Sequence, residues 1–183
     1  MGPVRDASGL RLRRARVDDL PALVRHRAAM WEDIGGFGAG AIRAEAISYR
    51  RWASRRLRSG RLVGWVVEGE DGTLAGSGMV WLVESLPRPG MPETRRPYIL
   101  AMYTHPSYRG RGVASSIVRA AVAWSRAHGF GRITLHGSKM GRPVYARLGF
   151  ERTWEMRLEL RSPTAVRKSA PPRGADPRRA RAR

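Results

Sequence analysis

The chain has 183 residues, a formal net charge of +20 and no cysteine. The missing cysteine excludes disulfide bonds, thiolate metal sites and cysteine nucleophiles, and no apolar run reaches the roughly 18–20 residues of a membrane span. The four histidines show no ligand spacing such as HExxH, so we expect no metal. The N-terminus lacks the apolar core of a signal peptide, which predicts a cytoplasmic protein.

Arginine supplies nearly all of the positive charge, because Lys139 and Lys168 are the only lysines. Residues 161–183 hold eight basic residues and one acidic residue and lack apolar periodicity. We therefore expect a domain over 1–160 and a basic, disordered tail over 161–183. Clustered arginine is typical of nucleic-acid binding, which stays an alternative. Its spread over every predicted element favours ordinary solvated positions.

The first half of the chain alternates helical and strand patterns. In chain order we expect a strand over 9–14, a helix capped by Asp18 or Asp19 and running to about Asp33, a glycine-rich loop over 35–38, a helix over 41–59, and strands over 62–68 and 73–82 joined by a hairpin at 69–72.

The second half begins with a proline-rich stretch, which predicts an irregular loop over 83–96. We then expect a strand over 98–104, a helix over 112–128, a strand over 132–136, a helix over 142–148 and a last strand over 150–160. Strands that pair antiparallel and then alternate with helices predict an α/β fold. Its central sheet is mixed, mostly antiparallel and flanked by helices.

The most informative stretch is YILAMYTHPSYRGRGVA, residues 98–114. An apolar strand ends at His105-Pro106, and an Arg/Gly loop then leads into an amphipathic helix. Backbone N–H groups of a glycine-rich turn at a helix N-terminus favour a bound phosphate. Arg109 and Arg111 add positive charge to this loop. The pattern predicts a phosphorylated cofactor.

Two motifs resemble the GNAT N-acetyltransferase superfamily. RGRGVA at 109–114 matches the Q/R-x-x-G-x-G/A signature, and GRPVYARLGF at 141–150 is similar to the motif in which Tyr precedes Leu-Gly-Phe by two residues. The resemblance implies acetyl-CoA as donor substrate and a sheet whose strands splay apart at the cofactor site. It assigns cofactor contacts to Met102, Tyr103, Thr104, Arg109, Gly110, Arg111, Gly112, Val113, Ala114 and Ser138.

The resemblance also implies catalytic roles. Tyr145 would protonate the leaving thiolate, and a backbone N–H near Met102 would stabilise the oxyanion. The alternative role of Tyr145 is that of a core aromatic residue, and the alternative role of Ser138 is that of an ordinary turn residue. The general base is open, with Glu32 the first candidate because it ends a helix beside the glycine-rich loop. Asp33, Glu84 and His105 are the other candidates.

The function that follows is transfer of an acetyl group from acetyl-CoA to a primary amine, by direct attack in a ternary complex. Residues 133–139 read ITLHGSK and lack the Glu-Val-Arg-x-Ser-Asn stretch of ribosomal-protein N-terminal acetylases, which favours a small-molecule acceptor. A protein acceptor and a non-catalytic CoA- or RNA-binding module are the alternatives, and a homodimer is possible in this family. Ala101 and Trp154 replace asparagines of a narrower bacterial group. An altered acceptor would follow only if they face it.

Overall fold

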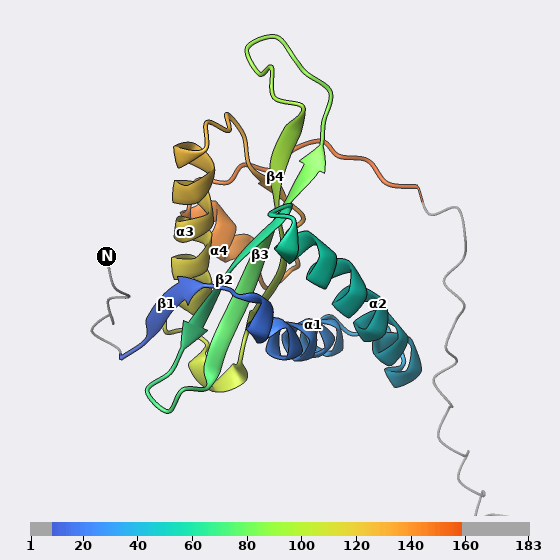
Figure 1. The fold of residues 1–183 in the computed structure, drawn as a ribbon, viewed down its shortest axis with the longest axis vertical. Helices are drawn as coiled ribbons and strands as arrows, with labels where there is room; N and C mark the ends of the chain where they lie inside the picture. Colours follow the sequence, from blue (N-terminus) through green and yellow to red (C-terminus); the bar gives the residue numbers. More distant parts are fainter. Residues whose placement is uncertain (1–8, 159–183) are drawn as a thin grey trace, which may run out of the picture. The chain divides into compact units, whose positions relative to one another are not determined.

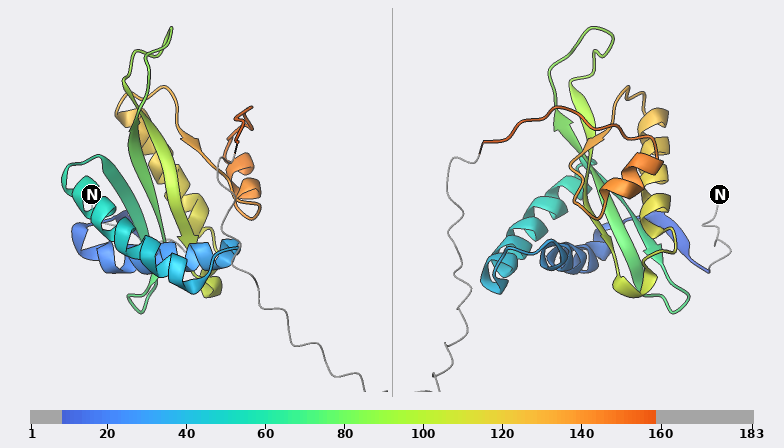
Figure 2. Two further views of the ribbon diagram at one scale, coloured as in Figure 1. Left: turned by 90° about the vertical axis from the view of Figure 1, so that its right-hand side faces the viewer. Right: turned by 180° about the vertical axis from the view of Figure 1, so that it is seen from behind.

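Five strands of residues 9–158 form one sheet in the order β1-β2-β3-β4-β5, and helices cover both of its faces (Figures 1 and 2). The structure is a computed structural model that describes residues 9–158. The strands are β1 (Arg11–Arg14), β2 (Leu62–Glu68), β3 (Leu74–Glu84), β4 (Arg95–Thr104) and β5 (Thr134–Leu135). Strands β1 to β4 pair antiparallel, and β5 runs parallel to β4. The mixed, mostly antiparallel sheet expected from the sequence is confirmed.

Helices α1 and α2 pack on one face of the sheet, and α3 and α4 lie on the other (Figure 2). The helical elements are η1 (Val17–Asp19), α1 (Leu20–Ile34), α2 (Ala39–Arg58), η2 (Pro106–Tyr108), α3 (Val113–Ala127) and α4 (Arg142–Arg147). No helix among the described residues is long and apolar enough to cross a membrane.

The core has two halves because β2 and β3 are buried on both faces. Val66 and Met79 face α1 and α2, whereas Val80 faces α3 together with Ile117 and Val118 of that helix. All five are at most 1% exposed, and burying such a side chain stabilises a fold by about 1.5–3 kcal/mol. The apolar stripe predicted for α3 therefore fixes that helix, and with it the loop before it, against the sheet.

Strand β4 carries an irregularity that later shapes the site. Ser77 pairs with Tyr103 and Met79 with Leu100, so Ala101 and Met102 together oppose Gly78. Ala101 has a φ of 51°, which is rare for a residue with a side chain. An extra residue of this kind is a β-bulge, and it bends the strand at that point.

The predicted elements match the structure with four differences. The hairpin of β3 and β4 pairs as far as Glu84 and Arg95, so the irregular loop is shorter than 83–96. The strand expected over 132–136 is only the two-residue β5. Asp19 stands at the predicted cap position, but its carboxylate accepts from Arg13, at 2.7 Å, instead of capping α1.

The fourth difference is the last strand, because residues 150–158 form none. Residues from Thr153 belong to a second unit of the chain, and their apolar side chains are exposed: Trp154 by 98%, Met156 by 94% and Leu158 by 81%. The alternating pattern that predicted a strand is present, but no neighbouring strand pairs with it among residues 9–158. The expected tail, 161–183, lies outside the described residues.

Candidate active site

The Arg/Gly loop between η2 and α3 is held in a fixed conformation. His105 begins η2, where its Nδ1 accepts from the backbone N–H of Ser107 at 3.3 Å. Gly110 and Gly112 then adopt φ values of 78° and 79°, a left-handed conformation that residues with a Cβ avoid. An added Cβ would meet no atom within 4 Å at either glycine. Both glycines therefore present backbone to open space.

The first turn of α3 is built to accept an anion. Gly112 caps the helix without a side-chain hydrogen bond, and the first turn holds no acidic residue. The N–H groups of a first helical turn have no partner within the helix and lie at its positive end. Val113 is 2% exposed, which anchors this turn in the core. The predicted phosphate-binding residues, from Arg109 to Ala114, thus form a suitable cradle for a pyrophosphate.

The two loop arginines have different contacts. Arg109 forms an ion pair with Asp33 at the end of α1, and its Nε donates to the carbonyl of Thr104 at 3.3 Å. The guanidinium of Arg111 stacks on the ring of Tyr108, 5.4 Å from its centroid. Arg109 therefore ties the loop to the α1 side of the sheet, while Arg111 lies on the loop itself.

Strands β4 and β5 separate just before the bulge. The two strands pair only at Tyr98 with Thr134 and at Ile99 with Leu135. Beyond Ile99, β4 has no pairing residue in β5. The backbone of Met102 to Thr104 is therefore open on that side. Extended backbone groups of this kind are able to pair with an amide-containing ligand such as a pantetheine arm. The splay implied by the resemblance is confirmed.

Tyr145 lies on α4 in a tight aromatic pocket. A Cβ added at Gly141 would stand 2.8 Å from its ring, and one at Gly137 would stand 3.4 Å away. Phe150 packs edge-on against it with ring centroids 5.9 Å apart. Burial, and to a lesser extent Tyr98, raises the pKa of Tyr145 to about 12. The phenol therefore stays protonated at neutral pH, as a proton donor must.

The Ser138 hydroxyl accepts from the backbone N–H of Gly141 at 3.2 Å, so it shapes the turn that leads into α4. A hydroxyl that accepts one bond still has a proton to donate, and Ser138 is exposed. Its position beside the Tyr145 pocket is compatible with the expected cofactor contact as well as with a turn role.

A polar cluster on the α1 side of β4 was missed by sequence reasoning. His26 of α1 packs on the ring of Tyr103, with centroids 4.9 Å apart, and its Nδ1 lies 2.9 Å from Oγ of Ser77. Burial, followed by the nearby Arg25, lowers the pKa of His26 to about 4. Its one sequence signal is a position three residues after the buried Leu23 of the same helix.

The carboxylates that are candidate bases lie at two places, at the end of α1 and at the end of β3. Glu32 is exposed at the end of α1. Burial raises the pKa of Tyr103 most, and the negative charges of Asp33 and Glu32 raise it further. Those two carboxylates are therefore near the splayed part of β4, but Asp33 is engaged with Arg109. Glu84 pairs with Arg95 at the opposite end of β3, about 20 Å along the strand from the bulge. Glu84 therefore does not lie beside the splayed part of β4.

Ala101 and Trp154 do not face a common site. Ala101 is 8% exposed and belongs to the core beneath α1 and α2, so its replacement of asparagine carries no consequence for the acceptor. Trp154 belongs to the second unit. Among residues 9–158 no three His, Asp or Glu side chains are grouped to hold a metal ion.

Comparison with known proteins decides the family. The model of the acetyltransferase (GNAT) family matches residues 27–150. The chain belongs to the GNAT acetyltransferase family. It is therefore an acetyl-CoA-dependent acetyltransferase, and the loop, the splayed strand and Tyr145 all fall within the matched range.

Two solved structures support this assignment over the whole domain. A GCN5-related N-acetyltransferase from Ralstonia eutropha is 35% identical, with a TM-score of 0.77, covering 83% of this chain and 99% of that one. A predicted acetyltransferase from Clostridium acetobutylicum, in a structure with acetyl-CoA, is 30% identical, with a TM-score of 0.74, covering 83% and 96% of the two chains. The aminoglycoside N-acetyltransferase AAC(6')-Iy shares the GNAT fold at 19% identity and a TM-score of 0.62. No curated protein matches the chain significantly.

Proposed function

We propose that this GNAT protein acetylates the primary amine of a small molecule by direct attack in a ternary complex. The observation that carries the proposal is the opening of the sheet at Ala101, where the backbone of β4 no longer pairs with β5. This opening lies in the same strand that leads into the Arg/Gly loop. A donor bound along this opening would present its thioester to an acceptor that enters from the α1 side.

Each expected residue has a separate task in this proposal. The N–H groups of the loop from Arg109 to Ala114 would hold the pyrophosphate, and the backbone of Met102 to Thr104 would hold the pantetheine arm, with Ser138 as a side-chain contact. The donor supplies an acetyl thioester. The N–H near Met102 would stabilise negative charge on the thioester oxygen, a contribution on the order of 3 kcal/mol.

Tyr145 would complete the transfer as general acid. When the amine nitrogen bonds to the carbonyl carbon and the carbon–sulfur bond breaks, the sulfur takes a proton from the Tyr145 hydroxyl. The raised pKa of that hydroxyl keeps the proton in place until it is needed. The amine must first lose a proton, and Glu32 is our proposed acceptor, directly or through water. Glu32 is exposed at the end of α1, near Tyr103 of β4, and has no ion-pair partner among the described residues.

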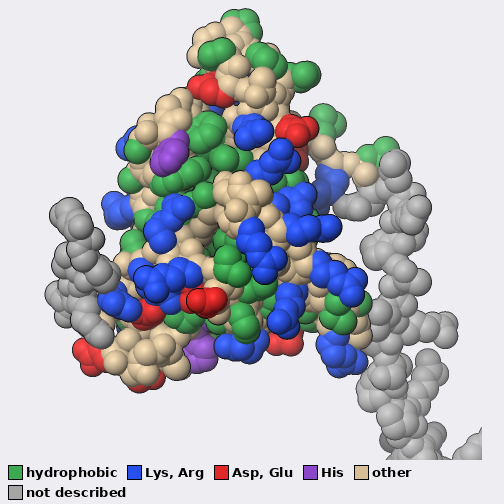
Figure 3. Space-filling view, viewed as in Figure 1, with side chains coloured by type: hydrophobic (Ala, Val, Ile, Leu, Met, Phe, Trp, Pro, Cys, Tyr) green, Lys and Arg blue, Asp and Glu red, His purple; other side chains and the backbone are tan. Residues whose placement is uncertain are grey.

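A small-molecule acceptor remains our preference over a protein acceptor, because the segment 133–139 lacks the peptide-acetylase stretch. Arginine side chains are scattered over several elements of the face drawn in Figure 3 and do not form one patch there. This distribution favours solvated surface arginine over a nucleic-acid platform.

We also propose that the protein forms a homodimer. Trp154, Met156 and Leu158 alternate along an extended segment and are almost fully exposed. Strand β5 ends the sheet, and no strand among residues 9–158 pairs with its outer edge. A second copy that covers this segment would remove three large apolar side chains from water. Light scattering of the wild type should give the mass of a dimer. The double variant Trp154→Ser, Met156→Ser should have the mass of a monomer. A monomeric wild type would contradict the proposal.

The test of the activity is a panel of primary amines, including amino acids, polyamines, aminoglycosides and N-terminal peptides, with detection of the free thiol of CoA. Tyr145→Phe is the informative variant, and Tyr49→Phe, which removes a buried hydroxyl from α2, is the matched control. Turnover of a small amine that is lost in Tyr145→Phe and kept in Tyr49→Phe supports the proposal. Turnover of peptides alone would replace the small-molecule acceptor with a protein acceptor.

A further inference from the structure

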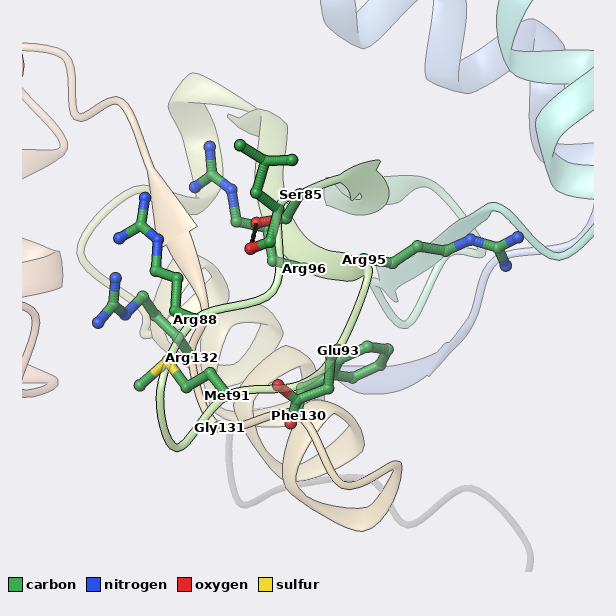
Figure 4. Close-up of a pocket in the computed structure, with 10 residues that line it drawn as sticks. Ser85, Arg88, Met91, Glu93, Arg95, Arg96, Phe130, Gly131 and Arg132 are labelled. Atoms are coloured by element: carbon green, nitrogen blue, oxygen red, sulfur yellow. Dashed lines mark hydrogen bonds between the residues drawn. The ribbon is translucent and has the colours of Figure 1, made fainter.

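A separate cavity lies between the tip of the β3–β4 hairpin and the turn that follows α3 (Figure 4). The functional site described above does not use it. Arginine predominates among the residues that line this cavity, which are Ser85, Leu86, Arg88, Met91, Glu93, Arg95, Arg96, Phe130, Gly131 and Arg132.

Three of the four arginines that line the cavity direct their guanidinium groups toward the same side of it. Arg88, Arg96 and Arg132 point together in Figure 4, whereas Arg95 points away. None of the four takes part in an ion pair among residues 9–158, although Glu93 lines the same cavity. Three positive charges close together repel one another, which costs free energy. A bound anion would be attracted to all three and would offset this repulsion.

Hydrogen bonds hold the backbone at Arg88 and the side chain of Arg96. Arg88 and Met91 exchange two backbone hydrogen bonds of 2.9 and 2.8 Å across the turn formed by Pro89 and Gly90. Gly90 has a φ of 74°, which this tight turn requires. Arg96 Nη1 donates to Thr134 Oγ1 at 2.5 Å, which fixes that guanidinium against β5. A site built in advance loses less conformational entropy when it binds a ligand.

The turn after α3 closes the other side of the cavity. Phe130 donates its backbone N–H to the carbonyl of Ser125 at 3.1 Å, so the helix end positions the following residues. A Cβ at Gly131 would lie 3.8 Å from Met91 Cγ, which shows how closely this turn approaches the hairpin. Arg132 therefore projects from a backbone that is fixed relative to Arg88.

The cavity is distinct from the cofactor loop. Arg96 precedes the bulge at Ala101 by five residues of β4, which is about 16 Å along a strand. The Arg/Gly loop lies beyond the other end of that strand. An anion in this cavity is therefore not the pyrophosphate of a donor bound at the active site.

We propose that Arg88, Arg96 and Arg132 form a second oxyanion site that binds a phosphate dianion. Arginine presents a planar fork of donors that matches phosphate oxygens. Three guanidinium groups favour a dianion over the single charge of a carboxylate. The phosphate belongs either to the free inorganic ion or to a phosphomonoester of a larger molecule.

The test is calorimetric titration of the full-length protein with inorganic phosphate at constant ionic strength. Arg88→Gln and Arg132→Gln should each weaken binding by about tenfold or more, because a charge-assisted hydrogen bond contributes roughly 1.5–3 kcal/mol. Arg95→Gln is the matched control, since it removes the same charge from the same cavity wall but from a side chain that points away. It should change the affinity by less than about twofold, because the Arg95 guanidinium points away from the other three.

Arg111→Gln distinguishes phosphate bound at the Arg/Gly loop from phosphate bound in the cavity. This variant should weaken binding at the loop and leave the affinity of the cavity unchanged. O-phosphoserine binding as tightly as inorganic phosphate indicates a phosphomonoester ligand, and weaker binding indicates the free ion. Equal affinity in Arg88→Gln, Arg132→Gln and Arg95→Gln would overturn the proposal, as would the absence of any site except the one weakened by Arg111→Gln. The readout is binding alone, so its outcome does not depend on acetyl transfer.

Discussion

Acidification should weaken the fold through His26, and this effect is measurable without a substrate. The imidazole packs between Tyr103 and Ser77 beneath α1. Its ordinary pKa is 6.5, and burial lowers the pKa in the folded protein to about 4. Between these two values the unfolded chain binds a proton that the folded protein excludes.

The sign and size follow from this difference. The neutral imidazole is fully compatible with the fold above about pH 6.5, and stability is lost as the pH falls from 6.5 toward 4. One pKa unit corresponds to about 1.4 kcal/mol, so His26 should reduce the free energy of unfolding by about 2 kcal/mol at pH 5. The loss levels off below pH 4, where both states are protonated.

Urea unfolding at pH 7.5, 6.5, 5.5 and 5.0 measures the effect in the wild type, in His26→Gln and in Ser77→Ala. His26→Gln should be less stable than the wild type at pH 7.5 but should lose about 2 kcal/mol less on acidification. Ser77→Ala keeps the burial that dominates the shift, so it should retain the wild-type pH dependence. Equal losses in the wild type and His26→Gln would refute the assignment of a buried, neutral imidazole.

Three other substitutions test separate parts of the structure. Tyr145→Phe should lower kcat by about 100-fold or more with little change in acetyl-CoA affinity, as expected for loss of a general acid; an unchanged kcat would remove Tyr145 from the mechanism. Gly78→Ala would place a Cβ 2.2 Å from Met102 Sδ, so it should lower the free energy of unfolding in urea by about 1–3 kcal/mol. The control Gly40→Ala places its Cβ in open space and should not lower that free energy. Asp33→Asn breaks the ion pair to Arg109, and because that pair is partly exposed the expected loss of stability is below about 1 kcal/mol; a larger loss would show that the pair holds the loop.

The regular parts of the fold were predictable from local sequence. The stripe of Val113, Ile117 and Ala121 predicted α3 to within a residue at each end. The alternation of buried strands with glycine turns predicted β2 and the hairpin to β3. These elements are determined by apolar periodicity and by local turn residues, which one sequence displays directly.

The remaining features depend on partners far away in the sequence. The bulge at Ala101 arises from register with β3, and no local residue type signals a positive φ there. Likewise, residues 83–84 continue β3 because 95–96 lie opposite them, although the prolines nearby predict a loop. His26 is a lone histidine on a helix, and only the packing of Tyr103 over it reveals a shared polar cluster.

Acetyl-CoA binding at the Arg/Gly loop is tested most directly by calorimetry on the wild type, Gly112→Trp and Gly129→Trp. The two glycines lie at opposite ends of α3, have φ values of 79° and 76°, and would each place a Cβ in open space. The backbone strain of the two variants is therefore matched. We predict that the wild type and Gly129→Trp bind acetyl-CoA and that Gly112→Trp does not. Undiminished binding by Gly112→Trp would contradict the placement of the cofactor at this loop.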